Sequence, residues 1–351
     1  MEKEIERIVI PDKLLDDKEE ISIRPSRFDE FIGQITLKES LKISIDSCIK
    51  TGESLDHILL SGPPGLGKTT IANILAKEMN KKIIVTSGPV LKPGDLLGVL
   101  TDLKKGDILF VDEIHRLNKI AEEILYPAME DFTIDVILKQ GDSSKAIKYN
   151  LNHFTLIGAT TKSGLLSAPF RDRFGISARL NLYSIDELIK ILNRSAVIMG
   201  IPINNGGAAE IARRGRGTPR IANRLLRRVR EFAISKDIKE IGKEITNDTL
   251  LLLRIDKFGL DDLDRKILSV IVEDFGGGPV GVKTIAISVG EDVRTVEDVY
   301  EPYLIKLGFL NRTSQGRETT AKARKHLKEV KKIFNKLDQR MEELRLLTNK
   351  H

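Results

Sequence analysis

The segment Gly62–Thr69, with the sequence GPPGLGKT, has the residue types and the spacing of a loop that wraps the phosphates of a nucleoside triphosphate. Its glycines permit a tight turn, so that successive backbone N–H groups point at anionic oxygens. Lys68 brings a positive charge to the β- and γ-phosphates, and the Thr69 hydroxyl is a ligand for Mg²⁺. We therefore predict ATP and Mg²⁺ as cofactors. The loop residues expected at the nucleotide are Gly65, Gly67, Lys68, Thr69 and Thr70.

A second group of chemically capable residues follows the apolar run 107–111, which ends in Asp112 and Glu113. Because successive side chains of a strand point to opposite faces, the two carboxylates can do different work. Asp112 is placed to hold Mg²⁺, together with Thr69, and Glu113 is placed to orient or deprotonate the attacking water. Two acids at a strand end also occur as a solvated terminus. The phosphate loop earlier in the chain favours the catalytic interpretation.

A third apolar run, 153–158, ends in Ala159, Thr160 and Thr161. A hydroxyl at this point could touch the γ-phosphate or the attacking water. Threonine at a strand end is also ordinary, so this feature alone leaves both interpretations open.

The elements that must position these groups form a recognisable order. Strands and helices alternate over residues 21–183, as in a parallel sheet covered on both faces, and a hairpin is predicted within 131–152. We predict a large ATPase domain at 1–183, a small helical lid at 184–255, a winged-helix DNA-binding domain at 256–330 and a basic tail at 331–351. The fold class is thus an α/β P-loop ATPase domain with a parallel sheet, a helical lid domain and a C-terminal winged-helix domain.

The composition limits where the protein works. Of 351 residues, 41% are hydrophobic and 31% charged, and no apolar run is long enough to span a membrane. The highly charged start of the chain lacks the apolar core of a signal peptide, and the single cysteine, Cys48, excludes an intramolecular disulfide. These features predict a cytoplasmic protein without a membrane partner.

Positive charge is concentrated in two stretches. The net charge is +6, and Arg213–Arg230 contains arginines but no acid, while residues 321–351 are rich in lysine. A basic cytoplasmic ATPase most often has nucleic acid as its polyanionic partner. The alternative is a solvated basic surface, and for the tail a solvated amphipathic helix is the favoured interpretation.

Motifs from the whole chain together resemble AAA+ ATPases, and in particular the RuvB family, which drives branch migration of Holliday junctions. The resemblance covers residues 21–328, and it is specific because the residues of the motifs and their order along the chain both match. The segments that carry it are Arg24–Gln34, Val111–Leu117, Gly158–Thr161, Phe170–Gly175, Gly217–Asn223, Gly277–Gly281 and Glu301–Ile305.

The resemblance implies roles that spacing alone does not give. Arg173 corresponds to an arginine finger that reaches the γ-phosphate bound by a neighbouring subunit, with Arg171 as the alternative finger, and Arg220 corresponds to a sensor arginine in its own subunit. The other residues that the resemblance implies at the nucleotide are Ile23, Arg24, Glu130, Asp131, Phe132 and Tyr183.

The resemblance also implies the partners. Arg294, Arg312 and Arg317 match DNA-contacting positions, and the 131–152 hairpin matches the contact with RuvA, the junction-binding protein. The family acts as a homohexamer on duplex DNA at a Holliday junction, with RuvC as an indirect partner, in recombination, DNA repair and the SOS response. The tail beyond about residue 327 is longer and more basic than the family pattern.

Three other classes of function remain open at this point. A clamp loader or replication initiator is compatible with the wing, but the residues of the motifs do not favour it. A protein-remodelling unfoldase would need a pore loop with an aromatic residue, which the sequence does not contain. A non-enzymatic winged-helix regulator is disfavoured by the intact pair Asp112 and Glu113.

Overall fold

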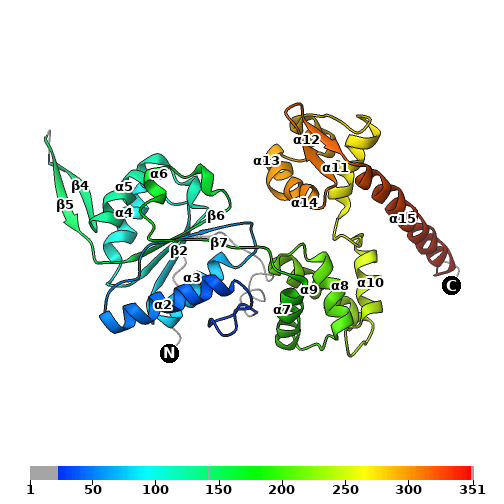
Figure 1. Ribbon diagram of the computed structural model, residues 1–351, viewed down its shortest axis with the longest axis horizontal. Helices are drawn as coiled ribbons and strands as arrows, with labels where there is room; N and C mark the ends of the chain where they lie inside the picture. The colour runs from blue at the N-terminus through cyan, green and yellow to red at the C-terminus, as the bar shows by residue number, and fades with distance from the viewer. Residues whose placement is uncertain (1–22, 141–142, 349–351) are drawn as a thin grey trace. The chain divides into compact units, whose positions relative to one another are not determined.

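A five-stranded parallel sheet forms the centre of the first part of the chain in this computed structural model, which describes residues 23–140 and 143–348 (Figure 1). The strands lie in the order β2 (Ile83–Ser87), β3 (Ile108–Asp112), β6 (Thr155–Thr160), β1 (Ile58–Ser61) and β7 (Ile176–Arg179). All neighbouring pairs run parallel, so the carboxyl ends of the five strands meet at one edge. That edge is where ligands bind in open α/β sheets.

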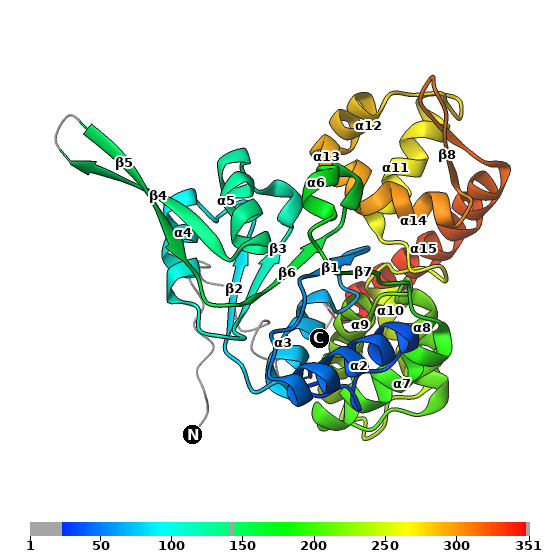
Figure 2. The same ribbon diagram turned by 60° about the vertical axis from the view of Figure 1, so that its left-hand side comes forward.

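Helices cover both faces of this sheet, and this explains why its central strands β3, β6 and β1 are mostly apolar and buried. Figures 1 and 2 show α2 and α3 on one face and α4 and α5 on the other. The strand residues Leu59, Leu109 and Leu156 are buried in one core with Leu100 of α4 and Leu125 of α5. The helices of this part are α2 (Ile35–Thr51), α3 (Lys68–Glu78), α4 (Pro93–Asp102), α5 (Lys119–Glu130), α6 (Ala168–Arg171) and α7 (Ile185–Ile198).

A long hairpin projects from the first part of the chain (Figures 1 and 2). It consists of β4 (Thr133–Gln140) and β5 (Ser143–Asn150), which pair antiparallel with Thr133 opposite Asn150. The predicted hairpin is therefore present, although its turn at 141–142 lies outside the described residues. Ile147 and Tyr149 on β5 are exposed.

The chain divides into two compact units. One contains residues up to 200 together with 218–220, and the other contains 201–217 and 221–351. Within the first unit, α7 begins with a capping box, in which Glu187 N donates to Ser184 Oγ and Ser184 N donates to Glu187 Oε2. The finer division into domains at 183, 255 and 330 remains a prediction.

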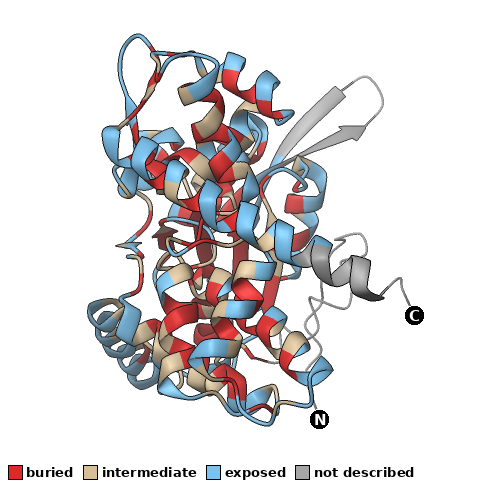
Figure 3. Cartoon of the chain, turned by 90° about the vertical axis from the view of Figure 1, so that its right-hand side faces the viewer, coloured by how far each residue is buried: buried red, intermediate tan, exposed pale blue. Residues whose placement is uncertain are grey.

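The second unit begins with helices and ends in a winged helix. Its helices are α8 (Asn205–Arg214), α9 (Pro219–Ser235, of which the first two residues belong to the other unit), α10 (Lys243–Leu252), α11 (Asp262–Glu273), α12 (Val282–Val289), α13 (Val293–Thr295), α14 (Glu301–Lys306) and α15 (Ala321–Thr348). The wing is the antiparallel pair β8 (Leu310–Arg312) and β9 (Arg317–Thr319). The core of the winged helix includes Ile267, Ile285, Leu304 and Phe309. Buried residues lie where the helices meet and exposed residues on their outer sides (Figure 3).

The segment between α10 and α11 is held by arginine side chains. Arg265 donates to the carbonyls of Arg254 and Leu260, each at 2.6 Å, Arg214 donates to the carbonyl of Asp256 at 3.0 Å, and Arg216 donates to the carbonyl of Gly259 at 2.9 Å.

The Asp256 carboxylate also holds the segment between α10 and α11 in place. It accepts from the backbone N–H groups of Phe258 and Leu260 and pairs with the buried His326 of α15 at 2.7 Å. The connection is therefore a fixed part of the second unit. No described helix has both the length and the apolar character needed to cross a membrane.

Candidate active site

The phosphate loop joins the carboxyl end of β1 to the start of α3, at the ligand-binding edge of the sheet. Gly62, Gly65 and Gly67 have φ values of 135°, 77° and 103°, a backbone conformation that residues other than glycine rarely adopt. A Cβ on Gly65 would lie 2.8 Å from side-chain atoms of both Thr218 and Arg220. Because the loop ends at the N-terminus of α3, its free N–H groups and the helix dipole favour a bound phosphate.

Lys68 is buried within this loop, and its Nζ donates to the carbonyls of Gly62 at 2.7 Å and Pro63 at 2.9 Å. Burial lowers the pKa of the Lys68 ammonium, while the Asp112 and Glu113 carboxylates oppose that shift. The two acids therefore lie close enough to Lys68 to interact with its charge. The structure thus brings the predicted cation and the predicted acids to one place.

Glu113 lies directly beyond the end of β3, in a left-handed conformation with φ of 48°. This conformation is uncommon for a residue with a side chain and marks a sharp turn of the chain. The Thr161 hydroxyl donates to Glu113 Oε2 at 3.1 Å. β6 lies next to β3, so the threonines at its end reach the acids at the end of β3. The hydroxyl predicted at this position therefore orients Glu113.

His115 is a residue that the sequence analysis missed. Its Nδ1 lies 3.2 Å from Glu113 Oε2 and 2.9 Å from the Thr160 hydroxyl. It stands two residues after Glu113 in the sequence, inside a short turn of 3-10 helix that follows the acids. The signal was its place in the segment Asp112–His115, which contains three ionisable side chains at a strand end.

Asp112 and Thr69 offer oxygen ligands of the kind that Mg²⁺ takes. Burial raises the pKa of the Asp112 carboxyl, and a divalent cation beside it would favour the charged form. Among the described residues no group of three or more His, Cys, Asp or Glu side chains could hold a metal ion. A hydroxyl and one carboxylate therefore fit an ion whose remaining ligands are phosphate oxygens and water.

Tyr183 and Arg220 also lie against the phosphate loop. The Tyr183 hydroxyl donates to the carbonyl of Leu66 at 3.1 Å, and burial raises the pKa of Tyr183. Arg220 N donates to the carbonyl of Gly65 at 3.4 Å, and its positive charge acts to lower the pKa of Asp112. Ile23 is buried, and its carbonyl accepts from Arg194. The assignment of Ile23, Arg24, Tyr183 and Arg220 to the nucleotide remains a prediction.

Arg173 lies at the opposite edge of the sheet from the phosphate loop. It lies three residues before the first residue of β7, Ile176, which pairs with Ile58 at the amino end of β1. Since β1 has four residues, about 13 Å of strand separates this edge from the loop. Arg173 pairs with Glu130 at 2.9 Å and lies over the ring of Tyr126. It cannot serve the phosphate loop of its own chain.

Glu130, Asp131 and Phe132 lie at the same amino edge as Arg173. Phe132 stacks on His153, with ring centroids 4.0 Å apart, and its ring also contacts His57. Both histidines precede the first residues of their strands. The structure therefore does not bring these three residues to the phosphate loop of the same chain, so a nucleotide contact by them would require the nucleotide of another copy.

The three candidate DNA-contacting arginines differ in their surroundings. Arg294 is exposed on α13, and Arg312 is exposed on the wing, with Glu297 at 3.8 Å. Arg317 is buried, with its guanidinium paired to Glu301 at 2.5 Å and to Glu297 at 2.8 Å. The hydrogen bond to Glu301 raises the pKa of Arg317. Against expectation, Arg317 is thus engaged within the protein, because two carboxylates lie beside it on one helical stretch.

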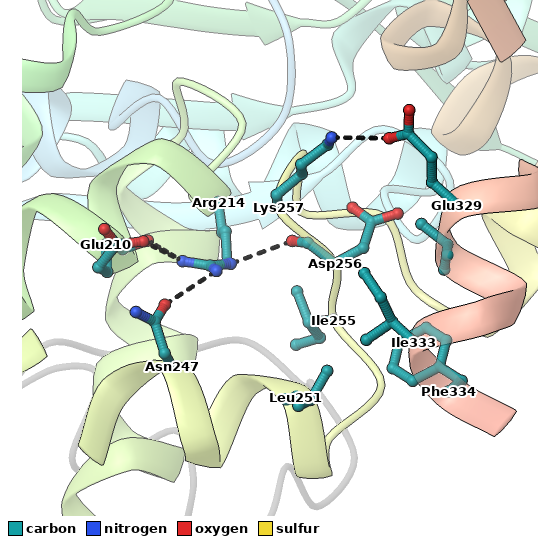
Figure 4. A pocket seen from close by; sticks show the side chains of 11 residues that line it. Glu210, Arg214, Asn247, Leu251, Ile255, Asp256, Lys257, Glu329, Ile333 and Phe334 are labelled. Carbon is teal, nitrogen blue, oxygen red and sulfur yellow. Dashed lines mark hydrogen bonds and ion pairs between the residues drawn. The ribbon is translucent and has the colours of Figure 1, made fainter. Parts of the chain in front are cut away.

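Four of the eight arginines in the run 213–230 are also paired within the protein. Arg213 and Arg214 each pair with Glu210 at 2.7 Å, Arg216 pairs with the buried Asp264, and Arg228 pairs with Glu231 at 2.8 Å. Arg214 lies at a cavity of about 320 Å³ lined by α8, α10 and α15, where it also donates to Asn247 (Figure 4). The charge of Arg214 is therefore matched by protein groups.

The loop, the acidic strand end and the helices after the sheet define a P-loop ATPase of the AAA+ class. Three family models match the chain in order: the Holliday junction DNA helicase RuvB P-loop domain at 23–180, the RuvB AAA lid domain at 183–256, and the RuvB C-terminal winged helix domain at 257–328. The chain belongs to the RuvB family. The predicted family, fold class and ATP hydrolase activity are thereby confirmed.

Individual relatives agree with this assignment. The Holliday junction branch migration complex subunit RuvB of Methanoregula boonei is 60% identical over 324 residues, which are 92% of this chain and 97% of that protein. The subunit of the same name from Fusobacterium nucleatum is 53% identical and covers 94% of this chain and 99% of its own length. The solved structure of the Thermotoga maritima RuvB Holliday junction branch migration motor is similar with a TM-score of 0.79 and 50% identity, covering 88% of this chain and 98% of that one.

Proposed function

We propose that this chain is an ATP-driven motor that moves Holliday junctions by branch migration along duplex DNA. The names of its relatives support this function, and so does the winged helix in its second unit. The activity belongs to recombination and DNA repair, including the SOS response, in the cytoplasm.

The observation that carries the proposal is the division of the ATPase groups between two edges of one sheet. Lys68, Asp112 and Glu113 lie at the carboxyl edge, and Arg173 lies at the amino edge. A complete set therefore requires two copies, each supplying one edge. Repeating this contact around an axis closes a ring, and we propose a homohexamer that encircles the duplex.

Within such a shared site the roles follow from charge and position. Lys68 and Arg220 of one copy, with Arg173 of the next, would offset the charge that develops on the phosphates. Glu113, oriented by Thr161 and His115, would align the attacking water. Bound Mg²⁺, held by Thr69 and Asp112, would neutralise charge on the β- and γ-phosphate oxygens.

The remaining contacts involve DNA and partner proteins. The exposed Arg294 and Arg312 would bind backbone phosphates without reading sequence, and the buried Arg317 would hold the wing in shape. The hairpin β4–β5, with Ile147 and Tyr149 exposed, would contact RuvA. RuvC would act on the same junction without touching this chain directly.

The test is the movement of a synthetic four-way junction with homologous arms, with and without RuvA. We expect branch migration with ATP and none with a non-hydrolysable analogue. ATP hydrolysis without junction movement under either condition would contradict the proposed motor. Tighter binding to an unstructured protein than to duplex DNA would instead indicate a protein-remodelling ATPase.

A further inference from the structure

The C-terminal helix α15 extends beyond the region that defines the family. The family model for the winged helix ends at residue 328, whereas α15 continues to Thr348. One face of its first half is packed against the second unit through buried residues: Ala323, His326, Val330 and Phe334. This packing fixes which face is turned outward, so the outward face has a definite composition.

Four lysines occupy that outward face. Lys325, Lys328, Lys332 and Lys336 are all exposed, and their spacing of three, four and four residues places them on one side of a helix. At a rise of 1.5 Å per residue the row is about 16 Å long. We refer to these four residues as the lysine row.

The carboxylates closest to the lysine row in the sequence are engaged with other cations. Glu329 pairs with Lys257 at 3.1 Å, and that hydrogen bond lowers the pKa of Glu329. Asp338 pairs with Arg254 at 2.5 Å. Within the described part of the chain, no ion pair within 4.0 Å involves any lysine of the row, although Lys325 does act on Glu329 at longer range.

A row of like charges one helical turn apart is unfavourable by itself. Arg213, Arg214 and Arg228 of the arginine-rich run are each paired with a carboxylate within one helical turn. The lysine row has no such pair among the described residues. A ligand with closely and regularly spaced negative charges would offset the repulsion. Duplex DNA carries one negative charge per about 1.7 Å of its axis, and lysine binds phosphate as a flexible point charge.

We propose that the lysine row is a second binding surface for DNA backbone phosphates, separate from the wing. The inference rests on the proposed function, in which the second unit binds duplex DNA. It is supported by the short distance along the chain, because β9 ends at Thr319 and α15 begins at Ala321. A duplex that contacts the wing could thus continue along α15. The surface recognises no sequence, as a motor on arbitrary DNA requires.

The experiment compares three variants with the unaltered full chain. The first changes all four lysines of the row to Gln, and the second changes them to Arg and keeps the charge. The third is a matched control for net charge that changes four exposed lysines of the first unit, Lys50, Lys92, Lys105 and Lys119, to Gln. Affinity for two unrelated 30-base-pair duplexes is measured as a function of KCl concentration, and thermal unfolding checks that each variant is folded.

We expect the Gln variant of the row to reduce the slope of log affinity against log salt by about 3 to 4, close to 0.9 per contact. Affinity should fall about equally on both duplexes, and the Arg variant should retain the slope. If the slope is unchanged in the Gln variant and the unaltered chain binds DNA normally, the DNA-binding role of the lysine row is refuted. The proposed motor function is not affected by that result. An equal loss in the matched control would also refute the role of the lysine row, since net charge would then explain the effect.

Two further outcomes separate the alternatives. Loss of binding to polyglutamate without loss of binding to DNA would overturn the inference in favour of an acidic protein partner. If the unaltered chain neither binds duplex DNA nor moves a junction, the proposed function fails, and the DNA-binding role of the lysine row fails with it.

Discussion

The two edges of the central sheet carry different kinds of chemistry. At the carboxyl edge the groups converge: Lys68 interacts with the charges of Asp112 and Glu113, and Thr161 holds Glu113 by a hydrogen bond. At the amino edge Arg173 is occupied by a surface carboxylate of its own chain, Glu130. One edge is thus assembled within a single copy, whereas in the proposed ring the other would complete the site of a different copy. Under the proposed function, one folded subunit would carry halves of two different sites.

The largest expected effect comes from the amino edge. Changing Arg173 to Ala should reduce ATP hydrolysis by the assembled protein by about 10³–10⁵-fold, because an arginine finger stabilises the transition-state charge. Binding of ATP should persist, since Arg173 lies away from the phosphate loop of its own chain. Hydrolysis and nucleotide affinity are measured on the same preparation. A greater loss for Arg171→Ala than for Arg173→Ala would reassign the finger to Arg171.

At the carboxyl edge, Glu113→Gln should lower turnover by about 10²–10⁴-fold while ATP remains bound, because the amide cannot accept a proton from water. Mixing this variant with Arg173→Ala subunits tests the division between the edges. Some interfaces of a mixed ring then pair an intact Glu113 with an intact Arg173, so partial activity should return. No recovery at any ratio that yields mixed rings would contradict a finger acting between copies.

A smaller effect is expected from the residue that orients the base. Thr161→Val removes the hydroxyl that donates to Glu113, and the loss of one such bond should lower turnover about 10-fold. Thr161→Ser retains the hydroxyl and should keep most of the activity. Equal losses in the two variants, at unchanged thermal stability, would show that Thr161 does not act through its hydroxyl.

The smallest effect is expected from Glu130. Its pair with Arg173 is partly exposed, so it is worth about 0–1 kcal/mol. Glu130→Gln should therefore change the protein concentration at half-maximal hydrolysis by no more than about 5-fold, in the direction of easier assembly. A loss of hydrolysis greater than 10-fold would instead mean that Glu130 contacts the nucleotide of a neighbouring copy.

The sequence predicted the carboxyl edge well for a physical reason. The phosphate loop and the acids lie within short contiguous segments. Phosphate binding requires a particular backbone conformation and particular charges, so the residues of these segments occur in a recognisable order. The amino edge leaves no such order, because in the proposed ring Arg173 would work through a surface that exists only in the assembly. Its role came from a resemblance to a family and not from spacing. His115 was missed because a histidine after a strand has no distinctive spacing.

Charge was the least reliable guide, since composition cannot tell a paired cation from a free one. The run 213–230 indicated a nucleic-acid surface, yet four of its eight arginines are paired with carboxylates. Arg317, which the family resemblance placed among the DNA contacts, is paired with Glu301. Asp264 and Glu301 are distant in sequence from the arginines they bind, whereas Glu210 and Glu231 lie only three or four residues from theirs. The exposed lysine row was visible in composition only as part of a basic tail.

The arginine-held segment between α10 and α11 has a mechanical consequence. A flexible linker absorbs displacement by bending, whereas a segment whose carbonyls are fastened transmits it. Here the carbonyls of residues 254, 256, 259 and 260 are each bonded to a guanidinium, and Asp256 is fastened to His326. The connection has the character of a stiff coupling. A displacement of α10 would therefore be transmitted to α11 and the wing with little loss through bending of the segment between them.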